Sequence, residues 1–413
     1  MQNTPEPEHH SPNYYVRRRL LANKPAVVGL VYILLMVLVT VLGYGIMPDD
    51  TPNANDGAVQ ISKRLPGYRT QVLKLRKNLE VPRRGFLGRV LHGQESAYTL
   101  VPIDDYRVEG LTVYATPVGR AAEQAYDLPA VVHPLYVRAT QQLDSTGNKW
   151  IARGDSVYWL DMAGEVHQTT RADLVASFEA GNVETRRYWL GTDKSGRDML
   201  SRLLYGARIS LSIGLVSVTI SMVLGILLGA FAGFFGRGVD RVITWFMSVV
   251  WSIPGIMLVI AISLALQSRG VWVAFVAVGL TMWVDVARVV RGQLMSAREQ
   301  LYVEAARSLG LSNLRIIFRH ILPNIGGPLI VIATANFAAA ILLEAGLSFL
   351  GLSVQPPTPS WGIMIYEGYN SMGTTNSWHL ILFPGLAISF MVLSFNLLGN
   401  GLRDAFDPKS LSK

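Results

Sequence analysis

The chain has 413 residues, of which 50% are hydrophobic and only 16% are charged. Soluble proteins average about 25% charged residues, so the composition argues against a soluble globular protein and indicates lipid as the main solvent. The net charge of +8 does not indicate nucleic acid, because proteins with many spans hold Lys and Arg in cytoplasmic loops, and the lack of cysteine excludes disulfides, thiol catalysis and Cys-ligated metal.

Apolar runs long enough to cross a hydrocarbon core of ~30 Å recur along the chain. Six transmembrane helices are predicted, at Pro25–Met47, Ile209–Phe235, Val242–Leu266, Val271–Val290, Ile325–Leu350 and Leu380–Leu402. The first follows a long polar leader at 1–24, and no small-x-small cleavage signature occurs at 45–48. We therefore expect an uncleaved anchor rather than a signal peptide.

Basic residues are concentrated in the leader, in the loops after the second and fourth spans, and in the tail at 403–413. They are Arg17, Arg18, Arg19, Lys24, Arg237, Arg241, Arg291, Arg298, Arg307, Arg315, Arg319, Arg403, Lys409 and Lys413. The opposite side has Arg269 in one short loop and no Lys or Arg between Leu352 and His379. Since positive charge in short loops marks the cytoplasm, both termini are expected there.

The segment 48–187 is then an extracytoplasmic insertion between the first two spans. Val72, Leu73, Leu75 and Leu79 suggest a short amphipathic helix in its basic first part. Strands are predicted at Tyr98–Val101, Leu111–Tyr114 and Ser156–Leu160, and turns at Asp144–Asn148 and Met162–Glu165. The expected fold is an all-α polytopic membrane protein with an enlarged, β-containing loop domain, followed by a core at 188–402 that holds the other five transmembrane helices.

Three features inside the spans bear on how the helices pack and bend. Asp285 and Arg288 are neighbours on one helical face and predict a salt bridge. Gly225, Gly229 and Gly233 repeat every four residues and predict close helix packing, while Pro254-Gly255 and Pro384-Gly385 predict kinks.

Glu344 lies near the outer end of the fifth span. Ionisable groups in spans are functional candidates, so it is a candidate for lining the solute path or pairing with a partner subunit. The alternative is an interfacial acid that snorkels to water.

The loop 291–324 has the pattern of a helix, a turn and a second helix. Leu301, Ala305 and Leu309 form a narrow stripe at helical spacing, and the alanine allows close approach of another protein. Gly310 is suited to the positive φ of a helix C-cap, and Ser312 or Asn313 to the next N-cap. Pro323 is expected to break the second helix. An incidental loop and a DNA-binding helix-turn-helix have the same outline, but the flanking spans argue against DNA.

This loop resembles the EAA loop of binding-protein-dependent ABC importer permeases. The match rests on Glu304, Ala305, Ala306, Gly310, Leu322 and Pro323, and departs from the family at His320, where isoleucine is usual. The resemblance implies that these residues form a coupling helix seated in a partner ATPase. It further implies two ABC ATPase subunits that carry ATP and Mg, a second permease subunit and an extracytoplasmic solute-binding protein, in a bacterial or archaeal cytoplasmic membrane.

A second motif, Tyr188–Arg202, precedes the second span. Its charged residues are expected to pair with one another as an ion-pair knot or to act as an extracytoplasmic gate. The motif residues are Gly191, Thr192, Asp193, Gly196, Arg197, Asp198 and Arg202. The segment resembles C-type permeases of oligopeptide, dipeptide and nickel importers, as do Leu342–Gly362 and Gly401–Pro408, whereas the insertion resembles nothing that we can name.

No phosphate-binding loop, zinc-protease motif or nucleophile elbow occurs, so the chain is not expected to be an enzyme or to bind a cofactor or metal itself. The sequence predicts a permease subunit of an ATP-driven importer for peptides or similar small solutes. Two alternatives are an ion-coupled secondary transporter, which predicts inverted repeats that we do not see, and a membrane-anchored enzyme with an extracytoplasmic domain.

Overall fold

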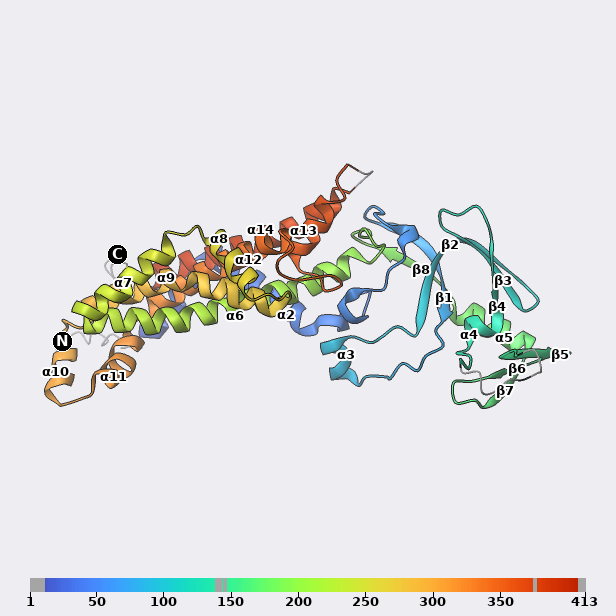
Figure 1. Ribbon diagram of the computed structural model, residues 1–413, viewed down its shortest axis with the longest axis horizontal. Helices are drawn as coiled ribbons and strands as arrows, with labels where there is room; N and C mark the ends of the chain where they lie inside the picture. The colour runs from blue at the N-terminus through green and yellow to red at the C-terminus, as the bar shows by residue number, and fades with distance from the viewer. Residues whose placement is uncertain (1–11, 138–142, 144–146, 374–376, 408–413) are drawn as a thin grey trace, which may run out of the picture. The chain divides into compact units, whose positions relative to one another are not determined.

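The computed structural model describes residues 12–137, 143, 147–373 and 377–407 (Figure 1). The chain divides into two compact units. The helical unit comprises Met1–Thr40, Gly206–Tyr366 and Pro384–Lys413, and the β unit comprises Val41–Tyr205 and Glu367–Phe383. Most of the predicted turn at 144–148 and the tail residues Lys409 and Lys413 lie outside the described residues.

Long apolar helices dominate the helical unit. Within the described chain, five helical stretches are long and apolar enough to cross a membrane: Lys24–Gly45, Met199–Phe235, Val271–Ala297, Asn313–Phe349 and His379–Phe406. A bent pair, α7 (Arg237–Trp251) and α8 (Gly255–Ala265), makes a sixth if it counts as one span. The protein is thus mostly helical, with five or six candidate membrane helices.

The two prolines have different effects. The axes of α7 and α8 differ by 93°, and Pro254 lies at the break, where its missing N–H and its ring oppose a continuous helix. The predicted kink at Pro254 is therefore confirmed. Pro384 lies inside helix α14 (His379–Phe406), which is not interrupted there.

Close packing of α6 (Met199–Phe235) on α9 (Val271–Ala297) depends on the predicted glycine repeat. A Cβ atom at Gly225 would lie 2.4 Å from the Cβ of Val286, and one at Gly229 or Gly233 would lie 2.5 or 2.6 Å from a backbone oxygen of α9. Any side chain at these positions would push the helices apart, so the predicted packing role is confirmed.

The predicted Asp285–Arg288 salt bridge is wrong for the part of the chain that the structure describes. The guanidinium of Arg288 instead lies over the ring of Trp251, 4.0 Å from its centroid, in a cation–π contact between α9 and α7. An aromatic ring on the neighbouring helix therefore replaces the carboxylate as the contact of this guanidinium.

Shorter elements complete the helical unit. They are α1 (Pro12–Ala22), α2 (Lys24–Leu42), α10 (Leu301–Ser308), α11 (Asn313–Arg315), the π-turn η4 (Ile316–Ile321), the 3₁₀ turn η5 (Leu322–Ile325), α12 (Gly326–Phe349) and α13 (Trp361–Tyr369), whose last residues belong to the β unit. The expected break at Pro323 is wrong: the run stays helical, because Pro323 occupies the first turn of η5, where no N–H is required.

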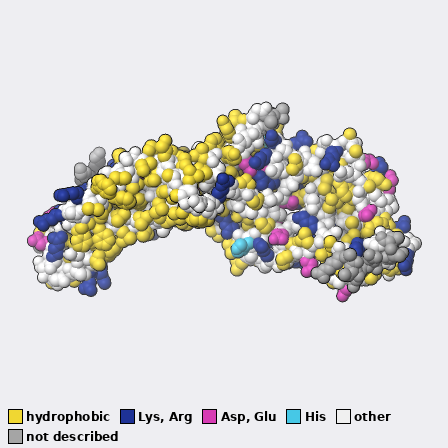
Figure 2. Space-filling view, in the orientation of Figure 1, with side chains coloured by type: hydrophobic (Ala, Val, Ile, Leu, Met, Phe, Trp, Pro, Cys, Tyr) yellow, Lys and Arg dark blue, Asp and Glu magenta, His cyan; other side chains and the backbone are white. Residues whose placement is uncertain are grey.

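Side chains on the visible face of the helical unit are sorted by type (Figure 2). Hydrophobic side chains cover most of its length, and Lys and Arg gather at the end that carries α10 and α11. An apolar band next to a basic end is the surface expected of a protein that lies across a bilayer.

The β unit contains two antiparallel sheets. The larger has the strand order β4-β3-β2-β1-β8 and the smaller the order β5-β6-β7. The strands are β1 (Tyr68–Arg76), β2 (Tyr98–Glu109), β3 (Thr112–Pro117), β4 (Gln124–Asp127), β5 (Trp150–Arg153), β6 (Ser156–Leu160), β7 (Val166–Thr170) and β8 (Val183–Tyr188). The three predicted strands and the turn after Asp161 are confirmed.

The helix suggested by Val72, Leu73 and Leu75 is wrong, since these residues belong to strand β1. This strand is central: Leu73 is opposite Val101 of β2 and Val183 of β8. Both Val72 and Leu73 are fully buried, so one side chain on each face of the strand is covered. Backbone pairing with a strand on each side therefore explains why this segment is a strand and not a helix.

Helices α4 (Leu128–Val132) and α5 (Arg171–Gly181) cover the larger sheet. Helix α3 (Phe86–His92) has no buried residue and packs on the 3₁₀ turn η1 (Gly43–Gly45) instead. Two further 3₁₀ turns are η2 (Pro52–Ala54) and η3 (Val59–Ile61). The Thr170 hydroxyl accepts a hydrogen bond from the Asp173 N–H and caps α5. The core joins the sheets to α4 and α5 through Leu73, Ile103, Val113, Ala115, Leu128, Val131, Val157, Leu174 and Phe178.

Candidate functional site

The inward face of α10 is held by a hydrophobic core at the end of the helical unit. Val303 and Ala306 are buried against Ile316, Ile317 and Ile321 of the following π-turn. The same cluster includes residues of α6 and α9, so the loop is packed onto two long helices. This arrangement fixes the α10–α11 hairpin to two of the long apolar helices.

The outward face of α10 is apolar and uncovered. The side chain of Leu301 is 82% exposed and that of Leu309 is 79% exposed, with Ala305 exposed between them. Glu304 is exposed next to this stripe. Two almost fully exposed leucines flanking a small residue form a surface suited to another protein.

Gly310 ends α10 in a Schellman motif. Its φ is +75°, its N–H donates to the Arg307 carbonyl at 2.9 Å, and the Leu311 N–H donates to the Ala306 carbonyl at 3.2 Å. The predicted positive φ is thus confirmed. The next helix begins after Ser312, although the Ser312 side chain makes no capping hydrogen bond.

The predicted coupling residues divide between the two faces of the hairpin. Glu304, Ala305, Gly310 and Pro323 are exposed, whereas Ala306 is buried and Leu322 is half-buried in the core behind α10. In this conformation the buried members hold the hairpin, and the exposed members present its surface.

One ion pair and one hydrogen bond to a backbone carbonyl secure the base of the hairpin. Both guanidinium arms of Arg291 on α9 reach the carboxylate of Asp240 on α7, at 2.5 and 2.7 Å. Arg298, just after α9, donates to the Gly233 carbonyl at the end of α6. These contacts tie together three helices beside the loop.

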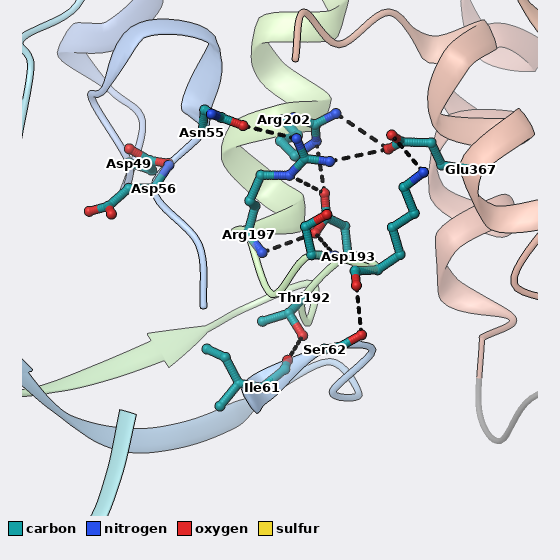
Figure 3. Close-up of polar contacts among 12 residues, drawn as sticks. Asp49, Asn55, Asp56, Ile61, Ser62, Thr192, Asp193, Arg197, Arg202 and Glu367 are labelled. Carbon is teal, nitrogen blue, oxygen red and sulfur yellow. Dashed lines mark hydrogen bonds and ion pairs between the residues drawn. The ribbon is translucent and has the colours of Figure 1, made fainter. Parts of the chain in front are cut away.

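A buried ion-pair cluster lies in the β unit, at the start of α6 (Figure 3). The Asp193 carboxylate is 2.6 Å from Arg197 and 3.1 Å from Arg202, and Glu367 is 3.4 Å from each guanidinium. All four residues are at most 6% exposed. Two carboxylates thus balance two guanidiniums in a site where an unpaired charge would be very costly.

Neighbouring polar groups complete this cluster. Lys194 reaches Glu367 at 3.3 Å, and the Asn55 side-chain oxygen accepts from Arg197 at 2.9 Å. The predicted internal pairing is therefore confirmed for Asp193, Arg197 and Arg202. Sequence reasoning missed Asn55 and Glu367, which lie far away in the chain. Glu367 is the one acid in the apolar segment 361–370, and this isolated charge was the signal available for it.

Thr192 and the two motif glycines join this segment to residues 58–64. The Thr192 N–H donates to the Arg64 carbonyl, and its hydroxyl accepts from the Arg64 N–H and donates to the Ile61 carbonyl. A Cβ atom at Gly191 would lie 2.3 Å from the Arg64 oxygen, and one at Gly196 would lie 1.8 Å from the Ala58 oxygen. Both glycines are therefore required by close backbone approach.

Asp198 does not enter the ion-pair cluster. Its carboxylate accepts from the Ser201 N–H at 2.7 Å and from the Ser201 hydroxyl at 2.6 Å, which caps the start of α6. The Ser201 hydroxyl in turn accepts from the Asp49 N–H.

Burial, together with the charge of nearby Asp49, raises the pKa of the Asp56 carboxyl to about 6, while Arg186 opposes this shift.

Glu344 is fully buried within the helical unit. Its carboxylate accepts from Ser348 at 2.7 Å, from Ser360 at 2.9 Å and from Ser210 at 3.3 Å. In this conformation the side chain does not snorkel to the surface, because three hydroxyls solvate it internally. A part in a solute path stays a prediction.

Helices of this length and apolarity place the chain in the class of multi-pass membrane proteins. Consistent with this class, residues 225–411 match the family of binding-protein-dependent transport system inner membrane components, and residues 11–66 match the N-terminal transmembrane domain of oligopeptide transport permease C. Together these matches cover the first span, the end of α6, all later spans and the hairpin.

Several known proteins are similar to this chain. The chain is 43% identical over 222 residues to the glutathione transport system permease protein GsiD of Pectobacterium atrosepticum, which covers 54% of this chain and 73% of that protein. It is 42% identical to the dipeptide transport system permease protein DppC of Alkalihalophilus pseudofirmus, over the same shares of both chains. A solved methionine ABC transporter has a TM-score of 0.43 at 19% identity, over 51% of this chain and 98% of that one.

The chain belongs to the family of binding-protein-dependent transport system inner membrane components, in the branch of oligopeptide and dipeptide permeases. It is the permease subunit of an ABC importer and a multi-pass inner membrane protein, not an enzyme with its own ATPase site. The resemblance noted in the sequence is thereby confirmed.

Proposed function

We propose that this chain pairs with a second permease subunit to form the path of peptides or peptide-like solutes across a bacterial or archaeal cytoplasmic membrane. The relatives named for glutathione and dipeptide transport support this class of solute. An extracytoplasmic binding protein would deliver the solute, and two ATPase subunits carrying ATP and Mg would drive the cycle.

The uncovered stripe of Leu301, Ala305 and Leu309 carries the proposal. Apolar side chains this exposed at the end of a membrane protein favour a protein partner, and Glu304 and Gly310 border the stripe. Closure of the two ATPases on ATP would push α10. The core behind Val303 and Ala306 would pass that movement to α6 and α9, switching the path between the two sides.

The topology of the proposal places six spans in the bilayer, with both termini and α10 in the cytoplasm and the insertion at 48–187 outside. The basic side chains at the end that carries α10 support this orientation (Figure 2). Because the chain has no cysteine, Glu123→Cys and Ser308→Cys each place one thiol on an exposed site. An impermeant reagent should label Glu123→Cys only from outside and Ser308→Cys only from the cytoplasm; the reverse pattern would reject the topology.

Co-purification tests the docking surface. Leu309→Asp places a charge on the proposed interface, so the ATPase subunits should no longer co-purify with the permease. Asn313→Asp adds the same charge to an exposed site on the same hairpin and should retain them. Equal recovery of the ATPases with both variants would contradict docking on this stripe.

A further inference from the structure

Helix α3 and the loop before it form an exposed surface that the transport cycle proposed above does not use. The side chains of Phe86, Leu87 and Leu91 are 81%, 73% and 46% exposed. Arg83 and Arg84 directly precede the helix, and the whole stretch 82–93 contains no acidic residue. Large apolar side chains this exposed, next to unopposed positive charge, require an explanation.

The apolar residues of α3 share one face, and one of them contacts the last turn of a candidate membrane span. Phe86, Leu87, Val90 and Leu91 recur at helical spacing, with Arg89 on the other side. Val90 packs on Gly45: a Cβ atom there would lie 3.5 Å from the Val90 side chain. Since η1 (Gly43–Gly45) is the last turn of the span Lys24–Gly45, α3 lies beside the end of that span.

The arginines differ in what they already contact. Arg89 makes a two-armed pair with Asp50, at 2.6 and 2.9 Å, which fixes α3 to the chain just after the span. One nitrogen of Arg84 donates to the carbonyls of His92 and Gly93. Arg83 is exposed and makes no hydrogen bond or ion pair with any residue that the structure describes.

A cavity of about 680 Å³ opens behind these arginines. Five arginines and four acidic residues line it, and two of the arginines already pair with lining acids, Arg89 with Asp50 and Arg186 with Asp56. The arginines are Arg76, Arg83, Arg84, Arg89 and Arg186. Arg83 and Arg84 make no ion pair with an acid that the structure describes, and a guanidinium is well matched in shape to phosphate oxygens.

We propose that α3 is an interfacial anchor that binds an anionic phospholipid. Phe86, Leu87 and Leu91 enter the boundary of the acyl chains, and Arg83 and Arg84 bind the phosphate headgroup at the mouth of the cavity. An amphipathic helix with arginines beside its apolar face binds at this depth of a membrane. The position of α3 beside the last turn of a span brings it to the bilayer surface, so lipid is the occupant that the structure favours.

Depth measurement by spin labelling tests the apolar half of the proposal. The full chain carries one nitroxide, at Leu87→Cys or at Val166→Cys, which is 58% exposed on β7 of the same unit. In bilayers containing phosphatidylglycerol, the label at 87 should collide more with oxygen than with a water-soluble nickel chelate, and the label at 166 should show the opposite. A label at 87 that is as accessible to the chelate as the control, or that becomes buried only when the binding protein is added, would overturn the anchor.

Lipid retention tests the basic half. Arg83→Glu with Arg84→Glu should lower the phosphatidylglycerol that co-purifies with the full chain by roughly tenfold or more, as measured by native mass spectrometry. Arg120→Glu with Arg153→Glu makes the same change of charge at exposed sites outside α3 and should change little. Equal lipid loss in both double variants would contradict a site at α3.

A third arm separates a lipid headgroup from a soluble anion. Excess inorganic phosphate should leave the bound lipid in place, because the acyl contacts hold it; displacement of the lipid would mean an anion site instead. Docking of the ATPases through α10 is measured separately, so failure of the anchor leaves the proposed transport function standing.

Discussion

Glycines occur in both sequence motifs of this permease, but the physical reasons for them differ. Gly310 has a φ of +75° and open space around it, since a Cβ atom there would meet nothing within 4 Å. Gly196 has the same φ of +75°, yet a Cβ atom there would lie 1.8 Å from the Ala58 oxygen. At Gly310 only the backbone conformation matters, whereas at Gly196 packing matters as well.

This difference separates a surface that is built to meet a partner from a segment that is built to stay closed. The α10 hairpin exposes apolar side chains and buries the residues that hold it in place. The Tyr188–Arg202 segment buries two guanidiniums against its own Asp193 and against the distant Glu367. Substitutions in the first should therefore affect coupling, and substitutions in the second should affect folding.

The largest effect is expected for Gly196→Ala. The new methyl group would overlap a backbone oxygen that cannot move alone, so the loss of stability should exceed about 4 kcal/mol and the protein should not accumulate in the membrane. Gly67→Ala is the matched control: its φ is +84° and its Cβ atom would meet nothing, so it costs only about 1–2 kcal/mol of backbone strain. Quantitative blotting of membranes would reveal equal amounts of both variants if packing were not the cause.

Glu367→Gln should have the next largest effect. It removes one of two carboxylates that balance Arg197 and Arg202, and breaking a buried pair typically costs about 3–5 kcal/mol. Adding Arg202→Gln restores the balance of charge, so the double variant should have a higher Tm than the sum of the single losses predicts. Strictly additive losses of Tm in purified protein would show that the charges do not act as one cluster.

The smallest expected effect is the contribution of the Asp56 carboxyl to the pH dependence of folding stability. Its pKa is raised to about 6, mainly by burial, whereas an unfolded Asp titrates near 3.9, so the folded state binds this proton more tightly. The stabilisation is complete below about pH 4 and is lost as the pH rises through about 6, a change of at most about 3 kcal/mol.

Asp56→Asn removes this titration. The Tm of the purified wild type should fall between pH 4 and pH 7 by more than that of the variant, all else being equal. Asp104→Asn changes an exposed carboxyl of the same unit and should keep the wild-type slope. An unchanged slope with Asp56→Asn would mean that other groups set the pH dependence.

Local pattern was enough to predict most of the helical unit. The length of the apolar runs located the membrane helices, the repeat of Gly225, Gly229 and Gly233 identified a contact face, and Gly310 marked the end of α10. These features depend on residues within a few turns of one another. At Pro323, where the sequence predicted a break, the chain stays helical by changing to a π turn and then a 3₁₀ turn.

Long-range contacts account for what the sequence did not reveal. Leu73 was assigned to a helix because its neighbours are apolar at mixed spacing, but its partners Val101 and Val183 come from distant strands. Glu367 completes the ion-pair cluster, although it lies 170 positions after Arg197 in the chain. The charges of the motif indicated that partners were needed, but nothing nearby in the chain indicated which residue would supply the last one.

The central claim is that α10 couples this permease to its ATPases, and solute uptake beside ATPase co-purification in Gly310→Val tests it most directly. A β-branched residue at a φ of +75° is strongly disfavoured, so α10 should turn away from its partner while the glycine-packed helices remain intact. The account predicts normal abundance in the membrane, loss of uptake, and ATPases that dissociate or hydrolyse without transport, with a milder defect in Gly310→Ala. Normal uptake with Gly310→Val would contradict it.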